Sequence, residues 1–333
     1  MLNSSSQQTS RVHSRRLQVI KQALTMFLVV IMLALPGAHA RPPSTRSGNT
    51  NSVLLPRIMG GSETHQKDYP FIVYLQNGAE KTFCGGSIIS DQWIVTAAHC
   101  IKSASASDIT VYIGQDQYNP DPSKSAQVVE VHNHPQYDDT SMVNDISLLR
   151  LASSISSNPA STISIDNSTV GDGTKVTALG WGYTSETGTS SSKNLKKGEL
   201  TTLSKADCGS RDTKFTGNDG PRICVAADTG TDTCPGDSGG PLIRKVNGEN
   251  VLVGITSFGT AGPGKSVTVN CGGAGMISLF THVAYFKSFI ESTTGGLRKF
   301  ENANGQGNSA GHFVPSVLLT AIAIVIVSAL SIA

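Results

Sequence analysis

The sequence lacks the motifs with which several classes of protein bind metals or phosphate. It has no Cys-x-x-Cys pair and no Cys/His cluster at the spacing of zinc ligands, which argues against a structural zinc. No paired acidic loop for calcium lies near residues 115–130, and neither a glycine-rich phosphate loop nor an internal repeat is present. We therefore expect a protein without a bound metal or cofactor.

The central part of the chain also lacks an excess of positive charge. Residues 58–295 contain 17 Lys and Arg against 23 Asp and Glu, a net charge of −6, so the charge of +2 on the whole sequence comes from its ends. A mildly acidic domain argues against nucleic acid as a partner.

The first 57 residues are predicted to be two processed segments. A basic stretch, an apolar run at residues 23–35 and the small-x-small sequence Ala-His-Ala at 38–40 are typical of a secretory signal peptide over residues 1–40. An uncut signal anchor is the alternative, but the apolar run is short for a membrane span. Residues 41–57 contain three prolines and several small polar residues, which predicts an unstructured propeptide.

The last part of the chain predicts attachment to the outer face of a membrane. Residues 296–313 read as a flexible linker, and residues 314–333 are apolar with no Lys or Arg after them. Small residues, a short polar spacer and a terminal apolar tail are the signature of a GPI-anchor signal, here with attachment at Asn308 or Ser309. A transmembrane helix is the alternative, since about 20 apolar residues suffice to span a bilayer.

All six cysteines lie in the central part of the chain. An even number of cysteines in a secreted protein predicts disulfides, although the spacing alone does not choose between the possible pairings. The six are Cys84, Cys100, Cys208, Cys224, Cys234 and Cys271.

From residue 58 onward, short β-rich runs alternate with Gly, Pro, Asn and Asp. Examples are residues 71–75, 109–113 and 251–255. Many short strands with frequent turns predict an all-β barrel or sandwich, which periodicity cannot separate. A last helix is predicted over residues 283–291, because four apolar side chains share one face there: Val283, Phe286, Phe289 and Ile290.

Three short segments carry residues that suit nucleophilic catalysis. A serine hydroxyl is a poor nucleophile near neutral pH and needs a base within hydrogen-bond reach. Ser238 lies in Gly-Asp-Ser-Gly-Gly-Pro-Leu at residues 236–242, among glycines that let backbone N–H groups crowd around one reacting oxygen. His99, in Thr-Ala-Ala-His-Cys, offers the base, and Asp145, in Asp-Ile-Ser-Leu-Leu, offers a carboxylate to orient it. The order His, Asp, Ser belongs to one of several unrelated solutions to this geometry.

Together these segments resemble the trypsin-like (chymotrypsin-fold) serine proteases over about residues 58–295. The resemblance implies an all-β fold of two antiparallel six-stranded β-barrels, with the active site between them and a C-terminal helix. It also implies a monomer that hydrolyses protein or peptide substrates through an acyl-enzyme, without a cofactor. The disulfides that it implies are Cys84–Cys100, Cys208–Cys224 and Cys234–Cys271.

The resemblance implies a role for each residue of the site. His99 is the expected base, Asp145 orients it, and Ser238 is the nucleophile. The backbone N–H groups of Gly236 and Ser238 are expected to form the oxyanion hole.

Arg-Ile-Met-Gly-Gly at residues 57–61 resembles the activation site of the family. Hydrolysis after Arg57 would create an ammonium group on Ile58, and this group would insert beside Asp237 and order the oxyanion loop. A buried carboxylate needs such a partner. The family sequence has Val where this chain has Met59, an apolar exchange that we expect to be tolerated.

Asp232, six residues before Ser238, matches the acidic residue at the base of the substrate pocket in trypsin-like members. A carboxylate there selects Lys or Arg before the scissile bond; the alternative is an ordinary loop carboxylate. Ser-Phe-Gly at residues 257–259 resembles the strand that pairs with the substrate backbone, with Gly259 leaving the pocket open and Ser257 bonded to Asp145.

The chain departs from the family pattern at three places around this pocket. Phe258 stands where tryptophan is common, and residues 260–270 form a longer loop than usual. Ser278 falls where glycine usually lies, and a side chain there would narrow the pocket and weaken the preference for Arg and Lys.

The sequence as a whole therefore predicts a secreted zymogen, cut after Arg57, that becomes a serine endopeptidase at the cell surface. The alternative is a non-catalytic, protease-like surface binding protein. Such proteins normally lose a triad residue or the activation arginine, and this chain keeps both. Asn167 begins the only glycosylation sequon of the mature domain, which suits a surface loop.

Overall fold

The computed structural model describes residues 58–301, except 81, 120, 156–161, 186–189, 228–229, 263–270, 274 and 298–299. The predicted signal peptide and propeptide (residues 1–57), the proposed attachment residues and the apolar tail at 314–333 lie outside this range. In the described range, no helix has the length and apolar character needed to cross a membrane.

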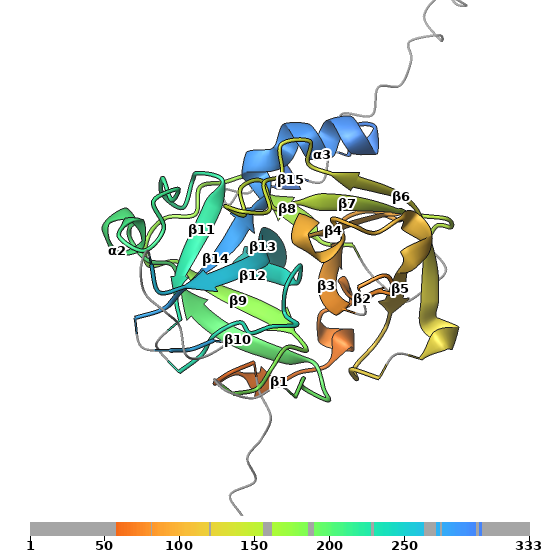
Figure 1. Ribbon diagram of the computed structural model, residues 1–333, viewed down its shortest axis with the longest axis horizontal. Coiled ribbons are helices and arrows are strands. Elements are labelled where there is room, and N and C mark those ends of the chain that lie inside the picture. Colours follow the sequence, from red (N-terminus) through yellow and green to blue (C-terminus); the bar gives the residue numbers. More distant parts are fainter. Residues whose placement is uncertain are drawn as a thin grey trace, which may run out of the picture. The chain divides into compact units, whose positions relative to one another are not determined.

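The first half of the domain is a closed barrel of six antiparallel strands, coloured orange to yellow in Figure 1. The apolar run after residue 70 supplies four consecutive buried side chains to its first strand. Closure leaves no strand edge unpaired, so every strand is held on both sides. In barrel order the strands are β2 (Ile72–Asn77), β3 (Thr82–Ile88), β4 (Trp93–Thr96), β7 (Ser147–Leu151), β6 (Ser125–Asn133) and β5 (Ile109–Ile113).

The second half is a nine-stranded sheet whose six main strands are green to blue in Figure 1. Six of its strands are antiparallel neighbours, and they correspond to the predicted second barrel. In order they are β10 (Lys196–Thr201), β9 (Lys175–Gly180), β12 (Pro241–Val246), β13 (Glu249–Thr260), β14 (Ile277–His282) and β11 (Arg222–Ala226).

This sheet differs from the predicted barrel in how it closes and in what is added to it. Among the described residues, β10 and β11, the first and last of these six strands, are joined only by the bridge between Thr202 and Val225 and by the bond from Leu203 N–H to the Cys224 carbonyl, 2.9 Å long. Three short strands are also attached: β1 (Ser62–Glu63) to β10, and β8 (Ser164–Asp166) and β15 (Phe300–Glu301), of which β8 pairs in parallel with β13 and β15. The predicted all-β fold with a C-terminal helix is confirmed.

The predicted C-terminal helix is present but begins as a tighter turn. A 3-10 turn, η5 (Val283–Phe286), leads into α3 (Lys287–Thr294). Gly295 then takes a φ of 74°, and the N–H of Gly296 bonds to the Glu291 carbonyl, which ends the helix as glycine commonly does. Three of the four predicted apolar side chains are buried, and Phe289 packs against the core partly exposed.

The remaining helices are short. They are η1 (Gln66–Asp68), η2 (Ala98–Cys100), η3 (Ala106–Asp108), η4 (Pro122–Lys124) and α2 (Lys205–Gly209).

One hydrophobic cluster joins the barrel to the second sheet. Side chains of the barrel, such as Leu75 and Val95, belong to the same buried cluster as Trp181 and Ile255 of the second half and Ile290 of α3. Because burial of apolar surface is the main stabilising term, the two halves are held together by a shared core.

The structure contains the same three disulfides that the resemblance implies. Cys84–Cys100 joins β3 to η2, Cys208–Cys224 joins α2 to β11, and Cys234–Cys271 joins the segment before Ser238 to the segment that follows β13.

Removal of either of the first two disulfides should destabilise the domain by a similar amount. Both connect residues 16 positions apart, so each restricts the unfolded chain about equally and contributes about 3 kcal/mol. We expect the double variants Cys84→Ala/Cys100→Ala and Cys208→Ala/Cys224→Ala to show comparable decreases in thermal stability by calorimetry. An unchanged melting temperature in either would contradict this assignment.

Candidate active site

His99 lies on η2, directly after the barrel strand β4, and is fixed by one carboxylate. Its backbone N–H donates to Asp145 Oδ1 over 2.9 Å, and its ring Nδ1 is 2.8 Å from Asp145 Oδ2. The bond at Nδ1 selects the orientation of the ring and leaves Nε2 as the nitrogen that can exchange a proton with a substrate.

Asp145 precedes β7 and is fully buried. Besides His99, its Oδ2 accepts a hydrogen bond from Ser257 Oγ at 2.5 Å, as the resemblance implies. The pairing of β13 with β14 shifts between Thr256 and Phe258, and such an irregularity re-aims the side chain within it. Asp145 thus accepts hydrogen bonds from both halves of the domain. These bonds supply the partners that a buried charge requires.

Thr281 is a second support of Asp145 that the sequence analysis missed. From β14, its hydroxyl donates to the Asp145 backbone carbonyl over 2.7 Å, although the two residues are 136 positions apart. In the sequence it is an ordinary strand threonine, so no local signal marks it.

Ser238 lies in the loop that leads into β12 and is held against the barrel. Its carbonyl accepts a bond from Gly85 N–H at 2.7 Å, and the next residue, Gly239, donates to the Thr256 carbonyl at 2.8 Å. A Cβ on Gly239 would come within 2.3 Å of Thr96 Oγ1, so only glycine lets the serine loop approach the segment before His99.

The described residues do not show a hydrogen bond between His99 Nε2 and Ser238 Oγ; Nε2 is 3.8 Å from Cys100 Sγ instead. In sites without substrate this contact is often long or misaligned and tightens when substrate binds. His99 is also within 4.8 Å of the sulfurs of Cys84 and Cys100, but these form a disulfide and cannot supply thiolate ligands to a metal.

The loop before Ser238 presents two unused backbone donors. Asp237 N–H bonds to the Cys234 carbonyl at 2.9 Å, whereas the N–H groups of Gly236 and Ser238 have no acceptor among the residues that the structure describes. Gly236 has a φ of 98°, and a Cβ there would lie 2.5 Å from the Phe83 ring. This conformation can offer both amides to a developing negative charge.

Asp237 is a fully buried carboxylate with amide partners. It accepts bonds from Gly182 N–H at 2.7 Å and Cys234 N–H at 2.9 Å, and burial raises its pKa to about 7. Across the described part of the chain, no ion pair involves it. The free energy of ionising Asp237 would therefore fall if a cation came close.

The segment that follows Arg57 is held in the second half of the domain. Ile58 is fully buried, and the Met59 carbonyl accepts a bond from Asp232 N–H at 3.0 Å. Further along, Glu63 on β1 pairs with Lys196 on β10 at 2.6 Å, and this lysine is fully buried. Sequence reasoning missed Lys196, since a lysine on a strand is usually exposed.

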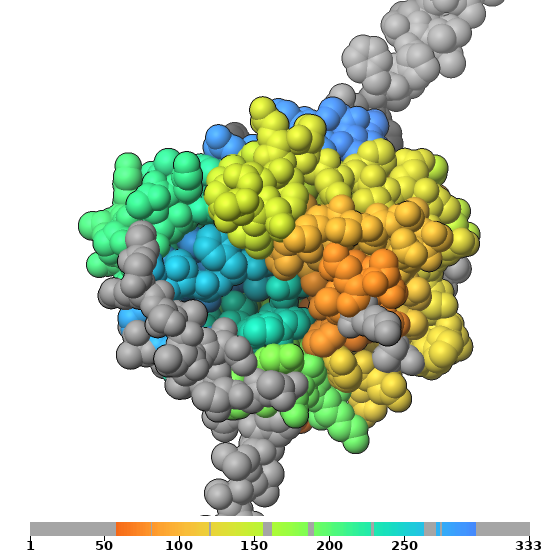
Figure 2. Space-filling view, in the orientation of Figure 1, coloured from red at the N-terminus to blue at the C-terminus, as the bar shows by residue number. Residues whose placement is uncertain are grey.

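A cavity of about 210 Å³ is lined by three of the four predicted pocket residues, Asp232, Ser257 and Gly259, but not by Ser278. Figure 2 shows the surface hollowed where the orange barrel strands meet the teal segment that carries Ser238. The cavity is lined by Asp232, Thr233, Cys234, Pro235, Ser238, Thr256, Ser257, Phe258 and Gly259. A larger cavity, of about 300 Å³, is lined by residues 113, 123–127 and 152–155 and contains none of the candidate residues.

Asp232 is buried at this cavity, with 1% of its surface exposed. Its carboxylate accepts bonds from Ser278 Oγ, Thr233 N–H and Gly272 N–H, and burial raises its pKa to about 6. The structure thus brings Asp232 and Ser238 to one cavity and places Ser278 against the carboxylate.

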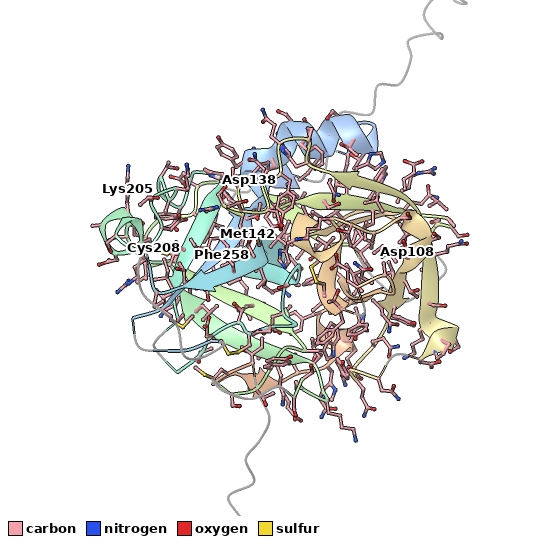
Figure 3. All side chains as sticks on the ribbon, viewed as in Figure 1. Asp108, Asp138, Met142, Lys205, Cys208 and Phe258 are labelled. Carbon is pink, nitrogen blue, oxygen red and sulfur yellow. A yellow bond between two sulfur atoms is a disulfide. The ribbon has the colours of Figure 1, made fainter. Side chains whose placement is uncertain are left out.

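Arg222 is a further residue that the sequence analysis missed. Its guanidinium bonds to Asp212 and to the carbonyl of Ser141, and lies 5.1 Å from the Phe258 ring centre. Phe258 and Met142, the neighbour of Ser141, are labelled in Figure 3. Through these contacts β11 supports both the cavity wall and the loop that leads to Asp145.

Asn167, which begins the predicted glycosylation sequon, is exposed directly after β8.

Known proteins resemble this chain over the same region. The Trypsin family model matches residues 58–290. Trypsin of Sarcophaga bullata is 35% identical over 239 residues, which cover 71% of this chain and 89% of that protein. Trypsin alpha of Drosophila melanogaster is 33% identical over 255 residues, 75% of this chain and 94% of that protein. Trypsin of Saccharopolyspora erythraea is 35% identical over 211 residues, 62% and 90% of the two chains. The family match covers more than half of the chain and coincides with the barrel, the second sheet and the site between them, so the chain belongs to the trypsin family of serine endopeptidases.

Proposed function

We propose that this protein is a secreted zymogen whose activated form cleaves peptide bonds after Arg or Lys. The observation that carries this proposal is the cavity shared by Ser238 and Asp232, next to a histidine oriented by Asp145. A nucleophile and a buried carboxylate in the lining of one cavity suit a substrate whose cationic side chain enters it.

In the proposed reaction, Ser238 Oγ attacks the scissile carbonyl while His99 Nε2 takes its proton. The imidazolium that forms is stabilised by Asp145, and His99 then gives the proton to the leaving amine. Water, deprotonated by the same nitrogen, hydrolyses the acyl-enzyme and restores the serine. The N–H groups of Gly236 and Ser238 would stabilise the oxyanion, at about 3–4 kcal/mol for each donor.

Activation would depend on the buried carboxylate of Asp237. Cleavage after Arg57 creates an ammonium on Ile58, and this cation would lower the pKa of Asp237 and hold it ionised. Since Asp237 separates Gly236 from Ser238, its position controls the direction of both free amides. The precursor, with a neutral peptide bond before Ile58, has no such cation to place there.

We further propose that the protein enters the secretory pathway, loses residues 1–40 and is held at the outer cell surface by its C-terminal tail, through a GPI anchor. The composition of the two ends supports this proposal. Glycosylation of Asn167 fits the same route and the exposure of that residue.

Ser238→Ala should abolish turnover while leaving the fold intact, because it removes the nucleophile and only one small hydroxyl. We expect kcat to fall by roughly a millionfold and labelling by a fluorophosphonate probe to disappear. Ser147→Ala is the control: it removes a buried serine hydroxyl that bonds to the His132 carbonyl outside the cavity, so labelling should persist. If Ser238→Ala kept more than about a hundredth of the activity, another residue would be the nucleophile, and an unlabelled wild type would favour a binding protein.

Arg57→Gln should give an inactive precursor, because no Ile58 ammonium forms. Arg46→Gln, which alters another arginine of the propeptide, should activate normally and serve as the control. Asp237→Asn should be cleaved after Arg57 but remain inactive, which separates processing from ordering of the loop. N-terminal sequencing and active-site titration measure the two steps. An active enzyme that begins elsewhere than Ile58 would disprove the zymogen mechanism.

A phosphatidylinositol-specific phospholipase should release the protease from intact cells, because the apolar tail would have been exchanged for a lipid. Deletion of residues 314–333 should yield a secreted enzyme with unchanged activity. Release only by detergent, with an epitope placed after Ala333 retained on the protein, would instead establish a transmembrane helix.

A further inference from the structure

The carboxylate at the base of the cavity already accepts three hydrogen bonds from the protein. Asp232 Oδ1 accepts Ser278 Oγ–H at 2.5 Å and Thr233 N–H at 2.7 Å, and Oδ2 accepts Gly272 N–H at 2.8 Å. A carboxylate has about four acceptor sites, two on each oxygen. The site left for a ligand is therefore on Oδ2.

The three hydrogen bonds that Asp232 already accepts affect the binding of lysine and arginine side chains differently. A guanidinium binds a carboxylate most strongly through two parallel N–H bonds, one to each oxygen. With both sites of Oδ1 in use, Asp232 cannot complete that arrangement unless Ser278 gives up its bond. An ammonium is a compact charge whose three donors can each find a separate acceptor, so it needs only one site on Asp232.

The hydroxyl and the bulk of Ser278 act in the same direction. Ser278 is 1% exposed and its Oγ bonds to Asp232, which lines the cavity of about 210 Å³, so its side chain takes up space next to that carboxylate. The longer arginine side chain needs more of this space than lysine does.

We propose that the cavity selects lysine over arginine before the scissile bond, because Ser278 occupies an acceptor site on Asp232 that a guanidinium needs for its two parallel bonds and an ammonium does not. This inference rests on the proposed function, which accepts both basic residues.

The test compares kcat/KM for two reporter peptides that differ only in Lys or Arg before the scissile bond, with active enzyme counted by titration. We expect the wild type to favour Lys by roughly tenfold, the size of one charge-assisted hydrogen bond. Ser278→Ala frees the acceptor but keeps the Cβ, and should raise the Arg rate relative to Lys by about the same factor. Ser278→Gly also frees the space and should move the ratio at least as far.

Thr202→Val is the matched control for Ser278→Ala: it removes a buried threonine hydroxyl from the same half of the domain, away from the cavity, and should leave the ratio unaltered. Inhibition constants of n-butylamine and n-propylguanidine should follow the same order in each variant, which shows the preference in binding without catalysis.

The outcomes separate this inference from the function on which it rests. A wild type that prefers Arg, with a ratio unmoved by Ser278→Ala, overturns the lysine selectivity and leaves the basic specificity intact. A shift with Ser278→Gly but not with Ser278→Ala shows that bulk alone decides, which overturns the acceptor argument. An enzyme that cleaves after Phe and after neither basic residue contradicts the proposed function itself.

Discussion

The buried carboxylate of Asp145 is the group on which the geometry of the site depends. The carboxylate accepts two hydrogen bonds from His99 on the barrel side and one from Ser257 on the second sheet. The backbone carbonyl of Asp145 accepts another from Thr281. A fully buried charge is tolerated only with such partners. The contact that orients the imidazole therefore also fixes the barrel against the second sheet, so the site requires the correct docking of both halves.

Two other buried carboxylates, Asp232 and Asp237, precede Ser238 in one short loop and differ in how their charge is balanced. Burial raises the pKa of both. Asp237 has two amide donors, and in our proposal the missing cation comes from the chain itself after cleavage. Asp232 has three donors at a cavity, and its missing cation would come from the substrate. One physical requirement, a counter-charge for a desolvated carboxylate, would then serve both activation and specificity.

The departures from the family pattern lie around the cavity and not among the triad residues. Phe258 replaces the common tryptophan and is supported from behind by Arg222. Met59 replaces valine, and its thioether lies beside Gly272, where an added Cβ would come within 2.4 Å of the sulfur. Ser278 adds a hydroxyl to the carboxylate of the pocket. A chain that keeps the reacting groups while it varies the wall retains the chemistry of its family and can change which side chain it accepts.

The sequence by itself determined the all-β class, the C-terminal helix, the family and the residues whose local motifs are distinctive, such as the glycine-flanked Ser238. Glycine positions and short motifs can be recognised in the sequence because their structural effect depends on a few neighbouring residues. Only the tertiary structure decided how the second sheet closes, through the bridge between Thr202 and Val225 and the bond from Leu203 to Cys224, and which residues support the site from a distance. Thr281 and Arg222 act on partners 136 and 81 positions away, and each looks like an ordinary strand residue in the sequence. Such contacts exist only after the strands have paired in one register, because pairing decides which side chains meet.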